Sequence, residues 1–135
     1  MKKESVITCL TKILYGILFH DLFLSEIIHL ISESGFEEKV FTLLVARLRL
    51  LSTRGVAVTQ AKEFESIGNG LYSMHLAGKG FNLRILFSFL PNRQPVLLLA
   101  FHEREGKKKT DYSTYLEPAL SRFAEKKEDY NHGFI

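Results

Sequence analysis

The stretch FNLRILFSFLPNRQPVLLLAFH, residues 81–102, decides the fold of this chain. It contains two runs of apolar β-formers, residues 81–90 and 96–102, which are separated by the proline-bracketed PNRQP. A third run, LYSMHL at 71–76, precedes them and is joined to them by AGKG at 77–80. Short apolar runs punctuated by glycine and proline are typical of β-hairpins. The sequence therefore predicts two or three consecutive antiparallel strands.

Apolar and polar side chains alternate along residues 81–90, so the two faces of this strand are expected to differ. One face is apolar: Phe81, Leu83, Ile85, Phe87 and Phe89. The other face is half polar: Asn82, Arg84, Leu86 and Ser88. A half-polar face in an antiparallel sheet is often solvated on that side. We expect this face to be partly open to a ligand.

Residues on both sides of the meander are expected to form helices. Residues 21–34 and 36–53 have apolar side chains at three- and four-residue steps, and Gly35 and Gly55 follow them as stops. A last helix is predicted over 111–127, with Pro118 in an early turn and a frayed tail at 129–135. Residues 12–19 are interpreted as a first strand, and 56–69 as a mixed connector. The predicted fold class is α/β (α+β), with helices on a small, mostly antiparallel sheet.

Length and composition indicate the class of protein. The 135 residues suggest one domain over 1–135. The single Cys9 cannot form an internal disulfide, which fits a reducing compartment. The charge-free run 13–19 is too short to span a bilayer, so a soluble cytoplasmic protein is predicted, with no membrane partner. No histidine and cysteine grouping has zinc-like spacing, and there is no phosphate-binding glycine loop, so neither a metal nor another cofactor is predicted.

The positive charge lies in the C-terminal half. The formal net charge is +3, and the excess of Lys and Arg over Asp and Glu falls wholly after residue 75. Its densest part is Lys107, Lys108 and Lys109 together with Arg104. A local cationic field favours polyanions such as nucleic acid, although a solvated loop is the ordinary explanation of a charge run. These four residues are candidate RNA-binding groups.

Two residues of the meander are candidates for chemistry. The Arg84 guanidinium could bind a phosphate through two parallel hydrogen bonds, or its stem could simply cover apolar neighbours. His102, at the end of its strand, could transfer protons near neutral pH, or it could be a structural histidine with a backbone partner. His75, Tyr72 and Tyr112 could stack on bases or orient a ribose, or the tyrosines could be ordinary buried phenols.

The order of these motifs resembles the RelE/ParE superfamily of toxins from toxin–antitoxin systems, and most closely its HigB-like, phage-derived branch. The resemblance covers residues 22–127. Members carry a GLYELR strand, an RILY strand and a LLHGF strand followed by two lysines, before a final helix. The matches here are Gly70-Leu71-Tyr72, the stretch RILF at 84–87 and the stretch LLAF at 98–101. The departures are Ser73, Met74 and His75 after the tyrosine, and a lysine run that comes later than in the family.

The resemblance implies a metal-independent endoribonuclease that cuts mRNA, in many members on the ribosome, and that a cognate antitoxin protein neutralises. In such enzymes the ribose 2′-OH attacks the adjacent phosphorus, which gives a 2′,3′-cyclic phosphate or 3′-phosphate and a 5′-OH. Arg84 would then stabilise the phosphate, and His102 would be the base or the acid. His75 would take a role that arginine usually has, and the lysine cluster with Arg104 would hold the RNA backbone.

A second reading stays open. ParE-like relatives share the fold but poison DNA gyrase through protein contacts, and some phage-derived members would serve only to bind a host protein. These members need no acid–base residues, so His75, Arg84 and His102 favour the nuclease. A domain that has lost its toxicity is the third reading.

Overall fold

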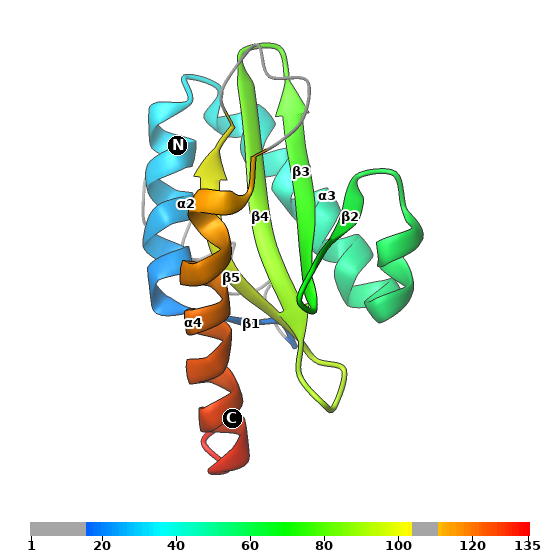
Figure 1. Ribbon diagram of the computed structural model, residues 1–135. Coiled ribbons are helices and arrows are strands. Elements are labelled where there is room, and N and C mark those ends of the chain that lie inside the picture. The colour runs from blue at the N-terminus through cyan, green and yellow to red at the C-terminus, as the bar shows by residue number, and fades with distance from the viewer. Residues whose placement is uncertain (1–15, 104–110) are drawn as a thin grey trace.

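The computed structural model describes residues 16–103 and 111–135, and in these ranges it is a mixed α/β fold. Three helices and one mostly antiparallel five-stranded sheet make up the architecture (Figure 1). In chain order the elements are β1 (Leu18–Phe19), α2 (Asp21–Glu33), α3 (Glu37–Arg54), the 3₁₀ turn η1 (Gly55–Gln60), β2 (Phe64–Gly68), β3 (Leu71–Gly78), β4 (Phe81–Phe89), β5 (Pro95–His102) and α4 (Ser113–Asn131). The predicted mixed fold class is confirmed at this level.

The sheet has the order β1-β5-β4-β3-β2. Its strands pair antiparallel except β1, which runs parallel to β5 through two residue pairs. The predicted meander is therefore present as β3, β4 and β5. Two details of the prediction were wrong: 56–69 contains the edge strand β2, and within the described residues the first strand is only Leu18–Phe19.

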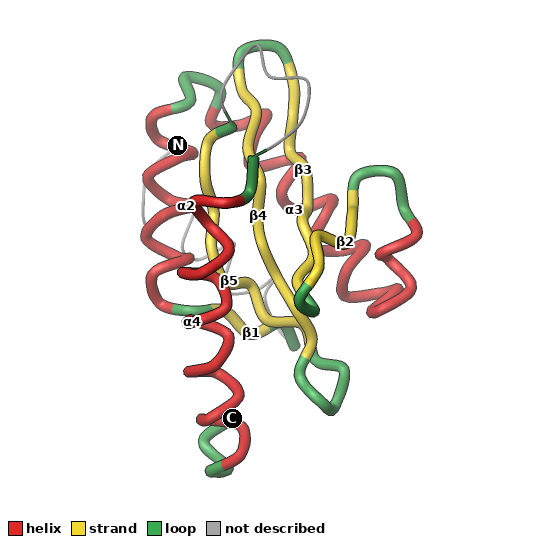
Figure 2. The backbone as a smooth tube through the Cα atoms, in the orientation of Figure 1, coloured by secondary structure: helices red, strands yellow, loops and turns green. Residues whose placement is uncertain are grey.

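The two faces of the sheet are covered by different helices. Figure 1 shows α2 and α3 on one side of the sheet and α4 on the other, and Figure 2 shows the same layers by element type. The apolar positions of β4 pack with α2 and α3 in one core cluster, and α4 packs on Leu86, Leu99 and Phe101 in another. Below, the first is called the hairpin face, because α2 and α3 form a helical hairpin, and the second is called the α4 face.

The face of β4 that was expected to be partly open is partly exposed at one end and buried at the other. Leu86 is fully buried under α4, and Ser88 is buried and donates a hydrogen bond to the Gly70 carbonyl at 2.6 Å. The four side chains of this face do not reveal in the sequence which of them a helix will cover. The apolar stripe of α4 covers Leu86 and Ser88. Only the end of the face that carries Asn82 and Arg84 stays partly exposed.

The C-terminal helix is longer than predicted. It runs to Asn131 and ends in a Schellman motif, in which Phe134 N donates to Asp129 O at 2.8 Å and Gly133 N to Tyr130 O at 3.1 Å. The predicted fraying from 129 was therefore wrong for the first residues of that tail. Pro118 is the sixth residue of α4 and is exposed, so it lies in an early turn, as predicted.

A β-bulge interrupts the pairing of β4 with β5. Leu86 pairs with Leu99 and Phe87 with Leu97, so Leu98 has no partner in β4. A bulge of this kind places two consecutive side chains on the same face. Leu98 and Leu99 accordingly both join the core under α4, and the alternation of β5 is inverted after this point.

The bulge lies where α2, β5 and α4 meet. The carbonyl of Leu98 accepts a hydrogen bond from Arg122 of α4 at 2.9 Å, and the amide of Ala100 donates one to Glu26 of α2 at 3.1 Å. Glu26 and Arg122 also pair directly, at 2.7 and 2.8 Å. Because β1 pairs with only two residues of β5, these side chains satisfy backbone groups of β5 that no strand among residues 16–103 and 111–135 reaches.

Candidate functional site

The site begins with a cross-strand pair on the α4 face. His75 of β3 lies directly opposite Arg84 of β4 in the antiparallel register. Their neighbours along the strands, Met74, Leu76, Leu83 and Ile85, belong to the core under α2 and α3, so His75 and Arg84 both face α4. Directly opposite side chains on one face are close enough to interact. Two of the three residues predicted to be catalytic are therefore brought together.

Arg84 is held by two carboxylates of unequal burial. Its Nε donates to Glu103 Oε2 at 3.3 Å, and the side chains of Arg84 and Glu103 are only 13% and 12% exposed. Its Nη1 lies 3.7 Å from Glu65 Oε1, on a side chain that is 50% exposed. The inner ion pair is thus mostly desolvated, and the outer one is loose and open to solvent.

The terminal nitrogens of Arg84 reach the surface. The only hydrogen bond of this guanidinium to a described residue is made by Nε. No buried side-chain nitrogen or oxygen among the described residues lacks a partner. Nη1 and Nη2 therefore contact solvent, and they are the two nitrogens that an arginine uses to bind an oxyanion from the end of the fork.

His75 is positioned from three sides. Its Nε2 donates to Asn82 Oδ1 and lies 3.6 Å from Glu103 Oε2. Its backbone carbonyl accepts a hydrogen bond from Arg47 Nε of α3 at 3.1 Å, across the sheet. The Asn82 amide oxygen is only an acceptor, so Nε2 carries a hydrogen. The His75 side chain remains 31% exposed.

Tyr112 closes the site beside α4. Its hydroxyl donates to Glu65 Oε1 and lies 2.9 Å from Ser73 Oγ. Burial, and then the hydrogen bond to Glu65, raise the pKa of Tyr112 from 10.0 to about 12. The phenol therefore stays protonated, and able to donate, at every physiological pH. Tyr112 was predicted as an RNA-binding residue, and the structure places it at the cluster.

His102 is not part of this cluster, contrary to the expectation that it would meet Arg84. It lies opposite Leu83 and is exposed on the hairpin face, whereas Arg84 faces α4. The bulge at Leu98 is the physical reason. Without the extra residue the register would place His102 opposite Asn82, on the face of Arg84, and with it Phe101 takes the position opposite Arg84.

The other predicted RNA-binding residues are not at the cluster either. Tyr72 lies opposite Phe87 on the hairpin face and packs its ring on Phe87 and Phe89. Its core packing agrees with the ordinary explanation of a buried tyrosine. Arg104, Lys107, Lys108 and Lys109 lie outside the described residues.

Three members of the site were not predicted: Glu65, Glu103 and Asn82. Glu103 follows β5 directly, and its backbone amide donates to Asn82 O at 2.8 Å, so the β4–β5 pairing extends to it. The alternation of Phe101 and Glu103 would have identified it, once the bulge was known. Glu65 could not be found, because β2 was interpreted as a connector.

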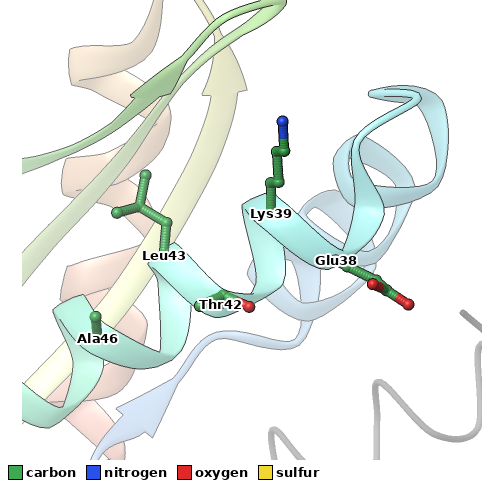
Figure 3. A pocket seen from close by; sticks show the side chains of 5 residues that line it. All are labelled: Glu38, Lys39, Thr42, Leu43 and Ala46. Atoms are coloured by element: carbon green, nitrogen blue, oxygen red, sulfur yellow. The ribbon is translucent and has the colours of Figure 1, made fainter.

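Two other features of the surface add no chemistry. Among residues 16–103 and 111–135, no group of three or more His, Cys, Asp or Glu side chains could hold a metal ion. A shallow depression on α3 is lined by Glu38, Lys39, Thr42, Leu43 and Ala46, all from one helix (Figure 3). Its polar side chains do not converge, since Lys39 and Glu38 point in different directions. No helix in the described part of the chain is long and apolar enough to cross a membrane.

Comparison of the chain with known proteins gives no match to a protein-family model and none to a curated protein.

Proposed function

We propose that this chain is the toxin component of a toxin–antitoxin system, a metal-independent endoribonuclease that cuts mRNA on the ribosome. The observation that carries the proposal is the cross-strand pair of His75 and Arg84, with Glu103 contacting both. The arrangement of two helices, an antiparallel meander and a last helix supports a RelE-like fold. A cognate antitoxin is the expected protein partner.

Scission of RNA without a metal requires a base, an acid and a cation within reach of one phosphodiester. Arg84 supplies the cation through its solvent-facing terminal nitrogens. His75, protonated on both nitrogens, gives its proton to the leaving 5′-oxygen. Glu103 accepts the proton of the 2′-hydroxyl. The new bond joins the 2′-oxygen to phosphorus, the bond from phosphorus to the 5′-oxygen breaks, and the products are a 2′,3′-cyclic phosphate and a 5′-hydroxyl.

The contacts that hold His75 in place support these roles. Arg47 fixes the backbone of His75, and Asn82 fixes its ring. Groups that hold the reacting side chains in place reduce the entropic part of the barrier. A general acid or base contributes about 10²–10⁴-fold in rate, so each of the three site residues should matter measurably.

The test is expression of the chain in growing cells, followed by mapping of RNA ends. The proposal expects new 5′-hydroxyl ends within coding sequences, and their loss when a translation inhibitor is added first. Purified chain added to translating ribosomes should give the same cleavage, with cyclic-phosphate ends on the upstream fragments. Intact mRNA in cells that arrest growth would overturn the proposal.

One observation favours a non-catalytic binder as the second candidate. Arg84 is already paired with Glu103, and both side chains are mostly buried, as in a structural ion pair. In that case the chain would act by contact with a host protein such as DNA gyrase. DNA breaks with intact mRNA after expression would support this candidate.

A further inference from the structure

The two carboxylates on Arg84 differ in burial, in distance and in the element that carries them. Glu103 lies at the end of β5, within the sheet, and its side chain is 12% exposed. Glu65 lies on the edge strand β2, is 50% exposed and reaches Nη1 only at 3.7 Å. A loose, solvated ion pair contributes about 0–1 kcal/mol, so an incoming anion can displace it.

We infer that the Glu65 carboxylate occupies the position of a substrate phosphate, and that a phosphodiester binds Arg84 by displacing it. This inference rests on the proposed function, since it names the anion that the same site receives. Glu65 is then an internal competitor. It keeps the guanidinium paired until the phosphodiester arrives.

The groups around Glu65 fit a phosphate as well as a carboxylate. Arg84 Nη1 forms an ion pair with Glu65 Oε1, and the Tyr112 hydroxyl donates a hydrogen bond to the same oxygen. Phosphate oxygens accept such charge-assisted hydrogen bonds in the same way. Burial, the largest cause of the raised pKa of Tyr112, remains when Glu65 leaves, so the phenol is still a protonated donor. The hydroxyl of Ser73 lies 2.9 Å from the Tyr112 hydroxyl, and the hydrogen bond between them holds the phenol in position.

The geometry also explains why this anion, and not Glu103, would leave. Removal of Glu103 would uncover a mostly buried guanidinium and would take a contact from His75. Rotation of Glu65 into solvent uncovers only one terminal nitrogen of Arg84 and the Tyr112 hydroxyl. This rotation breaks the hydrogen bond from the Tyr112 hydroxyl and the long ion pair to Arg84, and the incoming phosphate oxygens take over both donors while the half-exposed carboxylate regains its hydration.

The test is calorimetric titration of the full chain with inorganic phosphate at neutral pH and low salt. Glu65→Gln keeps the size of the side chain and removes its charge. We expect it to bind phosphate about tenfold more tightly than the wild type, because the competing charge is gone. Glu63→Gln is the matched control. It removes the same charge two residues away, where no side-chain hydrogen bond or ion pair joins Glu63 to a described residue, and should leave the affinity within about twofold.

Two further variants fix the position of the anion. Arg84→Gln should abolish phosphate binding, and Tyr112→Phe should weaken it about threefold or more, since each removes a donor. Circular dichroism establishes that each variant is folded. The Glu65→Gln result decides even where Arg84→Gln fails to fold, because Glu65 is half exposed.

The outcomes separate this inference from the proposed nuclease. If Glu65→Gln binds phosphate no better than Glu63→Gln, Glu65 is only a structural link between β2 and α4, and the inference is overturned. If the affinity rises as expected but RNA remains intact, the anion site stands and the nuclease function does not.

Discussion

Glu26 of α2 and Arg122 of α4 form a two-pronged ion pair beside the edge of β5, although they are 96 residues apart in the chain. Each also bonds the backbone of β5, so two helices on opposite faces of the sheet are joined through one strand. This link fixes α4, which in turn carries Tyr112 at its N-terminus beside the candidate site.

Breaking this pair should destabilise the protein measurably. Arg122→Met removes the partner of both Glu26 and the Leu98 carbonyl, and we expect a loss of about 2–4 kcal/mol in the free energy of unfolding. Lys126→Met is the control, since the Lys126–Asp129 pair is long, at 3.9 Å, and local; it should change stability by less than about 0.5 kcal/mol. Urea denaturation of both variants, of Glu26→Gln and of the double variant Arg122→Met/Glu26→Gln measures the coupling between the two side chains. Equal effects of Arg122→Met and Lys126→Met would contradict the structural role of the pair.

The locations of His75 and His102 predict that substitution of the first lowers the rate of RNA cleavage and substitution of the second does not. His75→Ala should lower the cleavage rate about 10²-fold or more, because it removes the proposed acid. His102→Ala should leave the rate nearly unchanged, since His102 is exposed on the other face of the sheet. Rates of 5′-hydroxyl end formation, measured with the purified variants on one mRNA during its translation, check both. A larger loss for His102→Ala would return the catalytic role to that residue.

Tyr112 makes stability depend on pH in the alkaline range. Its pKa is raised from 10.0 to about 12 in the folded state, so above pH 10 the unfolded chain releases this proton and the folded chain keeps it. The folded state then binds more protons, and the free energy of unfolding falls as pH rises from 10 to 12. Tyr112→Phe should remove part of that fall, while lowering stability near pH 7 by about 1 kcal/mol through the lost hydrogen bond. Denaturation of both proteins at pH 7, 10 and 11 tests the difference; parallel curves would contradict the assigned burial of the phenol.

Gly80 connects the β3–β4 turn to the start of α3. A Cβ at this position would lie 2.3 Å from the ring of Phe36, and its φ of +95° disfavours any other residue. Gly70 has a similar φ of +77° but open space around it. Gly70→Ala should therefore lower the free energy of unfolding by about 1–2 kcal/mol through the unfavourable φ alone, and Gly80→Ala should lower it distinctly more. Thermal unfolding of the two variants compares the effects directly, and equal losses would mean that the Phe36 ring moves aside freely.

The regular elements could be predicted from the sequence because their signals are local. Helices α2 and α3 follow from apolar spacing and from Gly35 and Gly55, and the strands β3 to β5 follow from alternation and turn residues. Helix α4 was also found, but not the Schellman motif at Gly133, which needs the backbone hydrogen bonds to be seen.

The composition of the site could be predicted only in part. Arg84 was identified as a charge within an apolar strand, and His75 and Tyr112 as rings that could stack on bases or orient a ribose. The pairing of His75 with Arg84 depends on strand register, and the placement of His102 on the other face of the sheet depends on one unpaired residue in β5. Register and bulges are set by packing across the whole sheet, so no short window of sequence reveals them.

The unpaired residue at Leu98 has a consequence for comparative work on this chain. Because of the bulge, the alternation of side chains between the two faces of the sheet is inverted after Leu98. A gap-free sequence alignment with a protein whose strand is regular therefore assigns the residues after Leu98 to the wrong face. Homology models of relatives built on this chain should therefore treat positions 95–97 and 99–102 as two separately anchored blocks.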